Sequence, residues 1–203
     1  MGSRVMHLLV ADCVAEELHL EDRGRVLVGS IAPDAHNGQR DRTHFKGPRY
    51  AWSDVAPYQY GQFLTKYHGR LTDGFFIGYL SHLITDDLWT TAMDFSGLKE
   101  RLKSTGAYYE VLYHDYYIAN AQLIHSHKGP DLHQVLDSGS VCEDLDEVDS
   151  ASVERLKQEA LSDFTYPASN VDRPLAFLTL DLIRACIERA AIRAIDAARP
   201  WIG

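Results

Sequence analysis

The sequence predicts an all-α fold, built as a single helical domain over residues 1–203. Apolar residues recur at the three- and four-residue spacing of a buried helix face along most of the chain. Strand patterns are scarce, because RVLVGSI at residues 25–31 is the only short β-branched run. A chain of 203 residues can bury a core without disulfide support. We therefore expect a helical bundle.

The helical pattern divides into segments that end at turn-forming residues. The expected helices span, in chain order, residues 4–20, 58–71, 74–93, 97–104, 106–127, 131–138, 151–163 and 174–198. Asp73-Gly74 separates the second helix from the third, Gly129-Pro130 stops the fifth, and Pro174 opens the last. The acidic stretch CEDLDEVDS, residues 142–150, supplies capping residues for the helix at 151–163.

One long irregular connection interrupts the helices. Residues 32–57, APDAHNGQRDRTHFKGPRYAWSDVAP, are rich in Pro, Gly, Asn and Asp and carry His36 and His44. Loops of this length inside a compact domain tend to be disordered or functional. The apolar residues just before this loop indicate ordered, buried backbone, so we expect the loop to be functional.

Composition narrows the class of protein. The net charge is −9, and Lys and Arg form no basic stripe, which argues against binding to nucleic acid. An acidic chain does suit a protein that holds divalent cations. The three cysteines lie far apart and form neither a zinc-thiolate motif nor a disulfide framework. We see no secretory signal pattern and no apolar run of about 18 residues, so we expect a cytoplasmic protein without a membrane span.

The stretch GYLSHLITDDLW, residues 78–89, carries polar residues in an otherwise apolar helix. His82 and Asp86 are four residues apart, so they lie on one helix face and can reach the same point. A metal site explains this pattern, and so does a buried His–Asp hydrogen bond. Asp34, after a proline, and His44, in THF, would complete a zinc site of three or four His and carboxylate ligands. Each also has an ordinary alternative, since Asp34 can start a turn and His44 can lie at the surface.

The order of these motifs resembles the zinc-dependent phospholipase C family, whose all-helical fold is shared with single-strand-specific nucleases. In that family an N-terminal-helix His, a loop Asp, a further His and a helical H-x-x-x-D assemble a multinuclear zinc cluster. The matching residues in this chain are His7, Asp34, His44, His82 and Asp86, within residues 4–90. The resemblance implies a metal-dependent phosphoesterase with one to three zinc ions. It also implies that Asp34 orients or deprotonates the attacking water.

Two features depart from the family pattern. The secreted enzymes use a mature N-terminal Trp as a ligand, whereas this chain begins Met-Gly-Ser-Arg. They also use an H-x-x-x-E helix, and that spacing does not occur here; His127 and Asp131 have the interval, but Gly129 and Pro130 lie between them. The best candidate to complete a further metal site is Asp115, in the Tyr-rich helix.

Two other functions remain open. A His-Asp-type phosphohydrolase would use an adjacent His-Asp dyad, and His114-Asp115 is the only one in the chain. A non-catalytic helical protein would use one structural metal site, or none, to tie the long loop to the helices. For the leading hypothesis, the expected partner is a small phosphorylated substrate or a phospholipid headgroup. The sequence indicates neither which substrate nor which oligomeric state.

Overall fold

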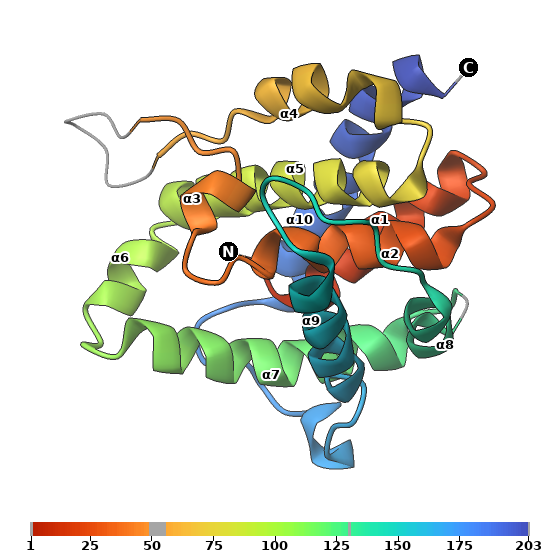
Figure 1. Cartoon of the computed structure of the whole chain (residues 1–203). Coiled ribbons are helices and arrows are strands. Elements are labelled where there is room, and N and C mark those ends of the chain that lie inside the picture. Colours follow the sequence, from red (N-terminus) through yellow and green to blue (C-terminus); the bar gives the residue numbers. More distant parts are fainter. Residues whose placement is uncertain (1, 49–55, 130, 203) are drawn as a thin grey trace.

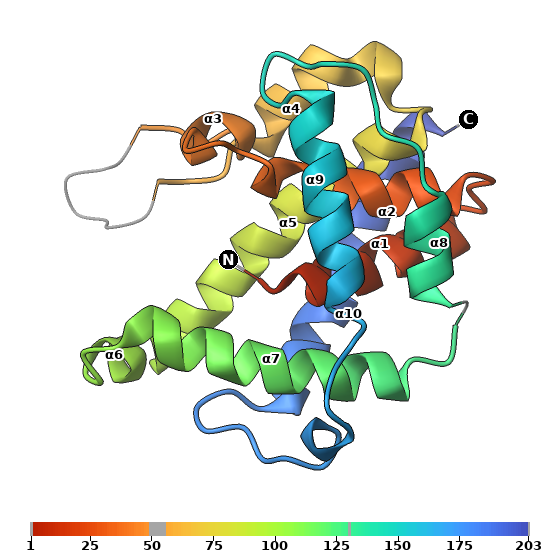
Figure 2. The ribbon, with the colours of Figure 1, turned by 60° about the horizontal axis from the view of Figure 1, so that its bottom comes forward.

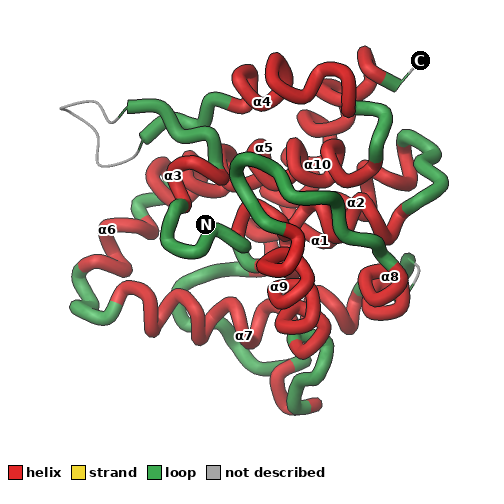
Figure 3. The backbone as a smooth tube through the Cα atoms, in the orientation of Figure 1, coloured by secondary structure: helices red, strands yellow, loops and turns green. Residues whose placement is uncertain are grey.

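The computed structural model describes residues 2–48, 56–129 and 131–202. Within these ranges the chain forms helices and no strands, apart from one isolated antiparallel bridge between Lys46 and Tyr58. The predicted all-α fold class is confirmed (Figure 3). Part of the predicted long loop, 49–55, and Pro130 lie outside the described residues.

Four helices form the centre of the bundle. They are α1 (Arg4–Glu17), α2 (Arg23–Ile31), α5 (Gly74–Phe95) and α10 (Leu180–Ala198). Helix α5 packs against the other three (Figure 1). All of its residues from Phe75 to Asp86 are buried, which explains why its sequence is apolar all round. The polar residues of this helix therefore lie inside the protein.

The remaining helices cover this centre. They are α4 (Tyr60–Tyr67), α6 (Leu98–Lys103), α7 (Tyr108–Ser126), α8 (Leu132–Ser138) and α9 (Ser150–Ser162). Helices α8 and α9 cover α2, α4 lies along α5, and α6 joins α5 to α7 (Figure 2). The start of the chain runs between α7 and α9, because Ser3 bonds Asn120 on α7 and Arg4 pairs with Asp163 at the end of α9. The N-terminal segment is thereby held inside the fold.

Helices α2 and α5 touch through their backbones. A Cβ atom added to Gly29 would lie 2.0 Å from the carbonyl oxygen of Phe75, and one added to Gly78 would lie 2.0 Å from that of Val26. Only glycine permits so close an approach. The β-branched run at residues 25–31 thus belongs to a helix, because its Val and Ile side chains pack against α5 and neighbouring helices.

The predicted helices match the structure within a few residues, with two differences, and α2 is a further helix that the sequence analysis did not predict. The last helix begins at Leu180, capped by Thr179, and not at Pro174. The predicted helix at 58–71 is α4 followed by a 3₁₀ turn, η2 (His68–Arg70). The long loop contains η1 (Ala32–Asp34) and α3 (Arg40–Thr43), and two further 3₁₀ turns are η3 (Ala168–Asn170) and η4 (Arg199–Trp201). Among the described residues, none of the helices combines the length and apolar character that crossing a membrane requires.

Candidate metal centre

Three parts of the chain bring five predicted ligands together. Helix α1 supplies one, the connection after α2 supplies two and α5 supplies two. These residues, named here the histidine cluster, are His7, Asp34, His44, His82 and Asp86. All are buried except Asp34, whose side chain is 13% exposed. Predicted ligands that are far apart in sequence therefore meet at one place.

The connection after α2 turns back so that Asp34 and His44 face the same point. Pro33 lies at the start of the 3₁₀ turn η1 and carries the chain directly from α2 into Asp34. Asn37 and Gly38 have positive φ angles of 43° and 84°, which reverse the chain between the two ligands. The turn residues of the predicted loop thus bring Asp34 and His44 together.

The two histidines His44 and His82 present the same ring nitrogen to each other. The Nδ1 atom of His82 donates to the carbonyl oxygen of Ser30 at 2.7 Å, and that of His44 lies 3.0 Å from the carbonyl oxygen of Arg40. A carbonyl accepts only, so Nδ1 of His82 carries the proton and its Nε2 carries a lone pair. Nδ1 of His44 also lies 2.9 Å from the hydroxyl of Thr43, and Nε2 of His44 carries a lone pair in the tautomer that donates from Nδ1 to Arg40. The two Nε2 atoms lie 3.2 Å apart. Two lone pairs at this distance repel unless a proton or a metal ion lies between them or beside them.

His7 adds a third imidazole without a hydrogen bond. Its ring stacks on that of His82, with the centroids 3.8 Å apart, and it is 1% exposed. Neither ring nitrogen of His7 has a hydrogen-bond partner among the described residues. Its Nε2 lies 3.4 Å from Oδ1 of Asp86. Leaving a buried polar atom unpaired costs about 1–3 kcal/mol, which a bound cation would offset.

The carboxylate of Asp86 is the most heavily bonded member of the cluster. Its Oδ1 accepts from the backbone N–H of Gly2 at 2.9 Å. Its Oδ2 accepts from Nη2 of Arg40 at 2.7 Å and from the hydroxyl of Tyr58 at 3.0 Å. These donors fix the orientation of the carboxylate, as outer partners of metal ligands usually do.

The carboxylate of Asp34 is held by fewer contacts than that of Asp86. Its Oδ1 lies 3.4 Å from Nε2 of His44 and 3.9 Å from Nε2 of His82, and it has no hydrogen-bond partner among the described residues. The carboxylate oxygen therefore faces the Nε2 atoms of both histidines. Carboxylate and imidazole groups placed in this way can hold a cation.

The protonation states suit metal binding. Burial, followed by the charge of His7, lowers the pKa of His82 to about 3, and burial also lowers the pKa of His44. Burial alone would raise the pKa of Asp34, but the neighbouring His82 and His44 outweigh it and hold the pKa below its ordinary value. The pKa of Asp86 is likewise held low, because the positive and hydrogen-bonding groups around it outweigh its burial. At neutral pH the cluster thus offers neutral imidazoles His44 and His82 and two ionised carboxylates.

The ligand atoms form two overlapping groups. One contains His7, Asp34 and His82, the other His44, His82 and Asp86, and within each group the atoms lie within 4.8 Å of one another. His82 belongs to both, but its Nε2 has a single lone pair and can bind one ion only. A second ion would need a carboxylate that bridges, with His7 or His44 as its imidazole ligand.

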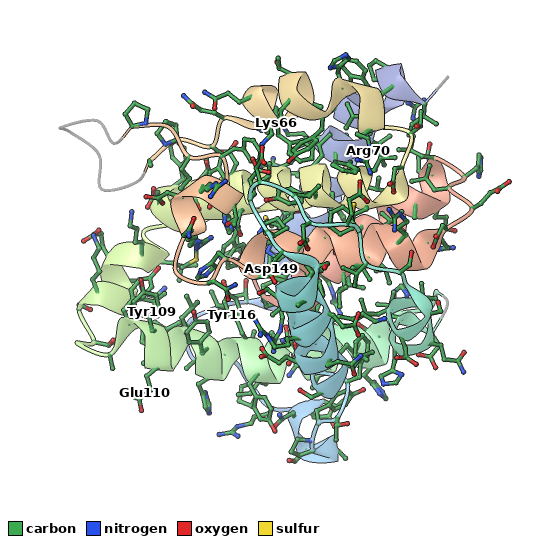
Figure 4. All side chains as sticks on the ribbon, in the orientation of Figure 1. Lys66, Arg70, Tyr109, Glu110, Tyr116 and Asp149 are labelled. Atoms are coloured by element: carbon green, nitrogen blue, oxygen red, sulfur yellow. The ribbon has the colours of Figure 1, made fainter. Side chains whose placement is uncertain are left out.

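A cavity of about 380 Å³ adjoins the cluster, and we name it the Asp34 cavity. Asp34 and Gly2 line it on the cluster side, and α7 contributes Tyr113, Tyr116 and Asn120. Figure 4 labels Tyr116 on α7. The remaining lining residues are Ser3, Arg4, His36, Tyr117, Leu156 and Asp163. A small molecule in this cavity would meet Asp34 at one end.

Comparison of the chain with protein-family models, with curated proteins and with solved structures finds no match. Conclusions about function therefore rest on the cluster and on its order along the sequence.

Asp115 lies apart from the cluster. It is fully buried, and its two oxygens accept the backbone N–H groups of Ala176, Phe177 and Leu178 at 2.7–2.8 Å. These donors occupy the carboxylate, so the geometry does not support the prediction that Asp115 completes a second metal site. Instead, Asp115 fixes the extended segment before α10, which explains why that helix starts after Pro174.

The members of the two other candidate His–Asp pairs have different partners in the structure. His114 is exposed, with its Nε2 3.4 Å from the guanidinium of Arg173, while Asp115 points into the core. His127 lies 3.5 Å from a carboxylate oxygen of Asp12, and Asp131 caps α8. Neither His114-Asp115 nor His127-Asp131 is a joint ligand pair.

Sequence reasoning missed the outer partners of the cluster. Arg40 contributes its carbonyl to His44 and its guanidinium to Asp86, and Tyr58 adds a hydroxyl. The only sequence signal for Arg40 is its position four residues before His44, which places its carbonyl within reach if the segment is helical. Tyr58 has no local signal, because it reaches Asp86 only through the fold.

Proposed function

We propose that this chain is a metal-dependent phosphoesterase, similar to zinc-dependent phospholipases C, that holds zinc in the histidine cluster. The observation that carries the proposal is the 3.2 Å approach of the Nε2 atoms of His44 and His82, each with its Nδ1 within hydrogen-bond distance of a backbone carbonyl. A metal ion satisfies such an arrangement, and backbone carbonyls are common outer partners of metal-bound histidines.

The unpaired atoms support a metal over a purely structural hydrogen-bond network. A structural network would use its buried donors and acceptors, because each one left unpaired costs free energy. Here both ring nitrogens of His7 and Oδ1 of Asp34 lack hydrogen bonds among the described residues. One ring nitrogen of His7 and a carboxylate oxygen of Asp34 lie within 4.8 Å of each other in the same ligand group, and a cation between them would satisfy both.

Zinc bound here would acidify a water molecule and polarise a phosphoryl oxygen. Asp34 is the carboxylate placed to act on the substrate side. Its side chain lines the Asp34 cavity and is 13% exposed, whereas Asp86 is completely buried. Asp34 orients the attacking water or takes its proton, and Asp86 serves as a ligand.

The Asp34 cavity favours a small substrate. Its volume of about 380 Å³ lies within the range of ordinary small-molecule sites. Arg4 and Asp163 form a bonded pair at its edge, at 2.7 and 2.8 Å, and tyrosine side chains line its α7 wall. A small phosphorylated molecule or a phospholipid headgroup fits such a site, and a cytoplasmic location remains our prediction.

Two alternatives are weaker. The His-Asp-type phosphohydrolase loses its dyad, because His114 is exposed and Asp115 is bonded to backbone. A closed structural metal site would leave no ligand open to solvent, whereas Asp34 faces a cavity.

The test is hydrolysis of bis(p-nitrophenyl) phosphate by the full chain. We expect turnover that EDTA abolishes and zinc restores, and its loss in Asp34→Asn. The matched control is Asp87→Asn, which removes a half-buried carboxylate one residue beyond Asp86 that lies outside the ligand groups. Zinc bound at the cluster without hydrolysis of any phosphodiester would favour a structural site. Absence of both zinc and turnover would overturn the proposal.

A further inference from the structure

The Asp34 cavity has one wall that takes no part in the proposed metal chemistry. It is formed by α7 and by an ion pair that joins the start of α1 to the end of α9, and Figure 2 shows these three elements close together. The residues of this wall, named here the Asn120 wall, are Tyr113, Tyr117, Asn120, Arg4 and Asp163. The part of a substrate that extends beyond a metal-bound phosphoryl group would lie against it.

Two tyrosine rings give the Asn120 wall a flat apolar surface. Tyr113 and Tyr117 are four residues apart on α7, so they lie one turn apart on the same helix face. Their exposed fractions are 49% and 51%, so the rest of the chain covers only about half of each residue. The ring of Tyr113 also stacks on that of Tyr109, with the centroids 6.1 Å apart. Exposed aromatic faces beside a cavity are suited to contact a ring of a ligand.

The charges of the Asn120 wall cancel. Nε and Nη2 of Arg4 donate to the two carboxylate oxygens of Asp163 at 2.7 and 2.8 Å, and this bidentate pair fixes both groups. Glu159 lies 3.5 Å from Nη1 of Arg4, but it is largely exposed and is not a lining residue. Asp34 is the one other Asp, Glu, Lys or Arg among the described residues that line the cavity, and it belongs to the histidine cluster. The wall therefore holds no unpaired charge that would attract a cationic headgroup or a second phosphate.

Asn120 adds neutral hydrogen-bond donors to the wall. The hydroxyl of Ser3 accepts from the backbone N–H of Met6, and it donates its own proton to Oδ1 of Asn120 at 2.7 Å. This bond sets the orientation of the amide and leaves its NH₂ group, with two N–H donors, for a ligand. The wall thus places amide donors beside a guanidinium and a carboxylate that neutralise each other.

A neutral hydroxylated ring matches this wall. Each hydroxyl group both donates and accepts, so neighbouring hydroxyls can bond the amide, the guanidinium and the carboxylate without adding charge. The C–H faces of such a ring are apolar and can pack on the tyrosine rings. A charged group would instead lose its water without meeting an unpaired opposite charge.

We propose that the substrate is a phosphodiester of a neutral hydroxylated ring, a sugar or a cyclic polyol, and that this ring binds against the Asn120 wall. The phosphodiester rests on the proposed function, whereas binding of the ring requires no metal. The two ideas are therefore tested separately.

The first test is a ligand-observed NMR titration of the full chain in EDTA. The probes are myo-inositol and methyl β-D-glucopyranoside as neutral hydroxylated rings, choline as a cation and adenine as a flat aromatic base. We expect one or both hydroxylated rings to bind more tightly than choline and adenine, by about tenfold. Equal or tighter binding of choline or adenine, or no binding of either hydroxylated ring by folded protein, would overturn the proposal.

Variants of the wall test whether the ring binds there. Tyr117→Ala removes exposed ring surface and should weaken binding of the hydroxylated ring about fivefold to tenfold. Asn120→Asp keeps an acceptor for Ser3 but removes the NH₂ donors, so it should also weaken binding. The control is Phe95→Ala, which removes an aromatic side chain of an 89% exposed residue outside the cavity lining and should leave affinity unchanged. Unchanged affinity in Tyr117→Ala, or an equal loss in Phe95→Ala, would contradict binding at this wall.

Hydrolysis by zinc-loaded protein distinguishes the two sources of such a ring. Glycerophosphoinositol offers it on a soluble phosphodiester, and phosphatidylinositol in detergent micelles offers it as a lipid headgroup. In the form that is hydrolysed, the inositol compound should have a higher kcat/KM than its choline counterpart, by about tenfold. A higher kcat/KM for the choline compound would contradict the proposed ring. No hydrolysis of any of the four compounds would contradict the proposed function, and the titration in EDTA would still decide whether the ring binds.

Discussion

The Nδ1 atom of His82 on α5 donates a hydrogen bond of 2.7 Å to the carbonyl oxygen of Ser30 on α2. This bond fixes the tautomer of the imidazole and directs its Nε2 toward His44. It exists because α2 and α5 approach closely at Gly29 and Gly78, which brings the carbonyl of one helix to the side chain of the other. The orientation of one cluster residue is thus set by the packing of two core helices.

Removing either α5 ligand should cost metal. His82→Ala deletes an imidazole and Asp86→Asn deletes the ligand charge at nearly constant size, so we expect both to lower bound zinc at least tenfold. Asp34→Ala and His44→Ala should behave in the same way if loop and helix form one site. The measurement is zinc per chain by mass spectrometry, with melting compared with and without chelator. A structural His–Asp pair would instead lose about 1–3 kcal/mol of stability with metal content unchanged, and that result would refute a metal centre here.

Substitution of Asp115 should destabilise the protein without affecting metal. Asp115→Asn leaves one oxygen and places an NH₂ group among three backbone N–H donors, so we expect a loss of about 1–3 kcal/mol in the free energy of unfolding. Urea unfolding and zinc content measure the two effects separately. Glu110→Gln, an exposed position on the same helix whose side chain points away from the body of the protein in Figure 4, is the control. Loss of zinc in Asp115→Asn would restore Asp115 as a ligand.

The contact between α2 and α5 should not tolerate a methyl group. In Gly78→Ala the new Cβ would lie 2.0 Å from the carbonyl oxygen of Val26, so the helices must separate. We expect a loss of at least about 3 kcal/mol, at the upper end of overpacking effects. Gly61→Ala in α4 is the matched control, since nothing lies within 4 Å of its added Cβ, and it should be neutral or stabilising by about 0.5–1 kcal/mol. Equal melting temperatures for the two variants would contradict this helix packing.

The metal-free protein should lose stability as the pH falls below about 6.5. The pKa of His82 is about 3 in the folded chain against an ordinary value of 6.5, so between these values the unfolded state binds a proton that the folded state does not. Stability is therefore complete above pH 6.5 and declines toward pH 3, by about 2 kcal/mol at pH 5. His44 acts in the same direction, and the lowered pKa values of Asp34 and Asp86 extend the loss below their ordinary value of 3.8.

The measurement for this pH dependence is urea unfolding in EDTA at pH 7 and pH 5. His82→Gln removes the titrating group, so its stability should change less between the two pH values than that of the unaltered chain. An identical change in both proteins would show that His82 is not held neutral by burial.

The sequence predicts the buried polar pair on α5 well, because its signal is local. His82 and Asp86 interrupt an apolar run, and in a helix buried on all sides such residues must have a polar partner inside the protein. Asp34 and His44 came from the order of motifs, and the structure places them beside the α5 pair. The sequence therefore predicts that these four residues lie together.

Asp115 shows why the remainder was not predictable. A buried carboxylate in an apolar helix looks the same in sequence whether it meets a metal ion or backbone N–H groups, and its partners here lie more than 60 residues later. The same contacts delay the start of α10, so Pro174 was a misleading helix signal. Arg40 and Tyr58 likewise reach Asp86 through tertiary folding alone.

The glycine contact between α2 and α5 also implies which residues of the histidine cluster are displaced first when the protein opens locally. Helices α2 and α5 are in close backbone contact. Their amide hydrogens should therefore exchange with solvent only when the whole chain unfolds. His82 and Asp86 lie on α5, so they should be displaced only by the same global unfolding. Asp34 and His44, by contrast, lie on a connection that contains only short helical turns. We therefore expect a metal ion to enter and leave when the connection between α2 and α4 moves away, while His82 and Asp86 on α5 keep their positions.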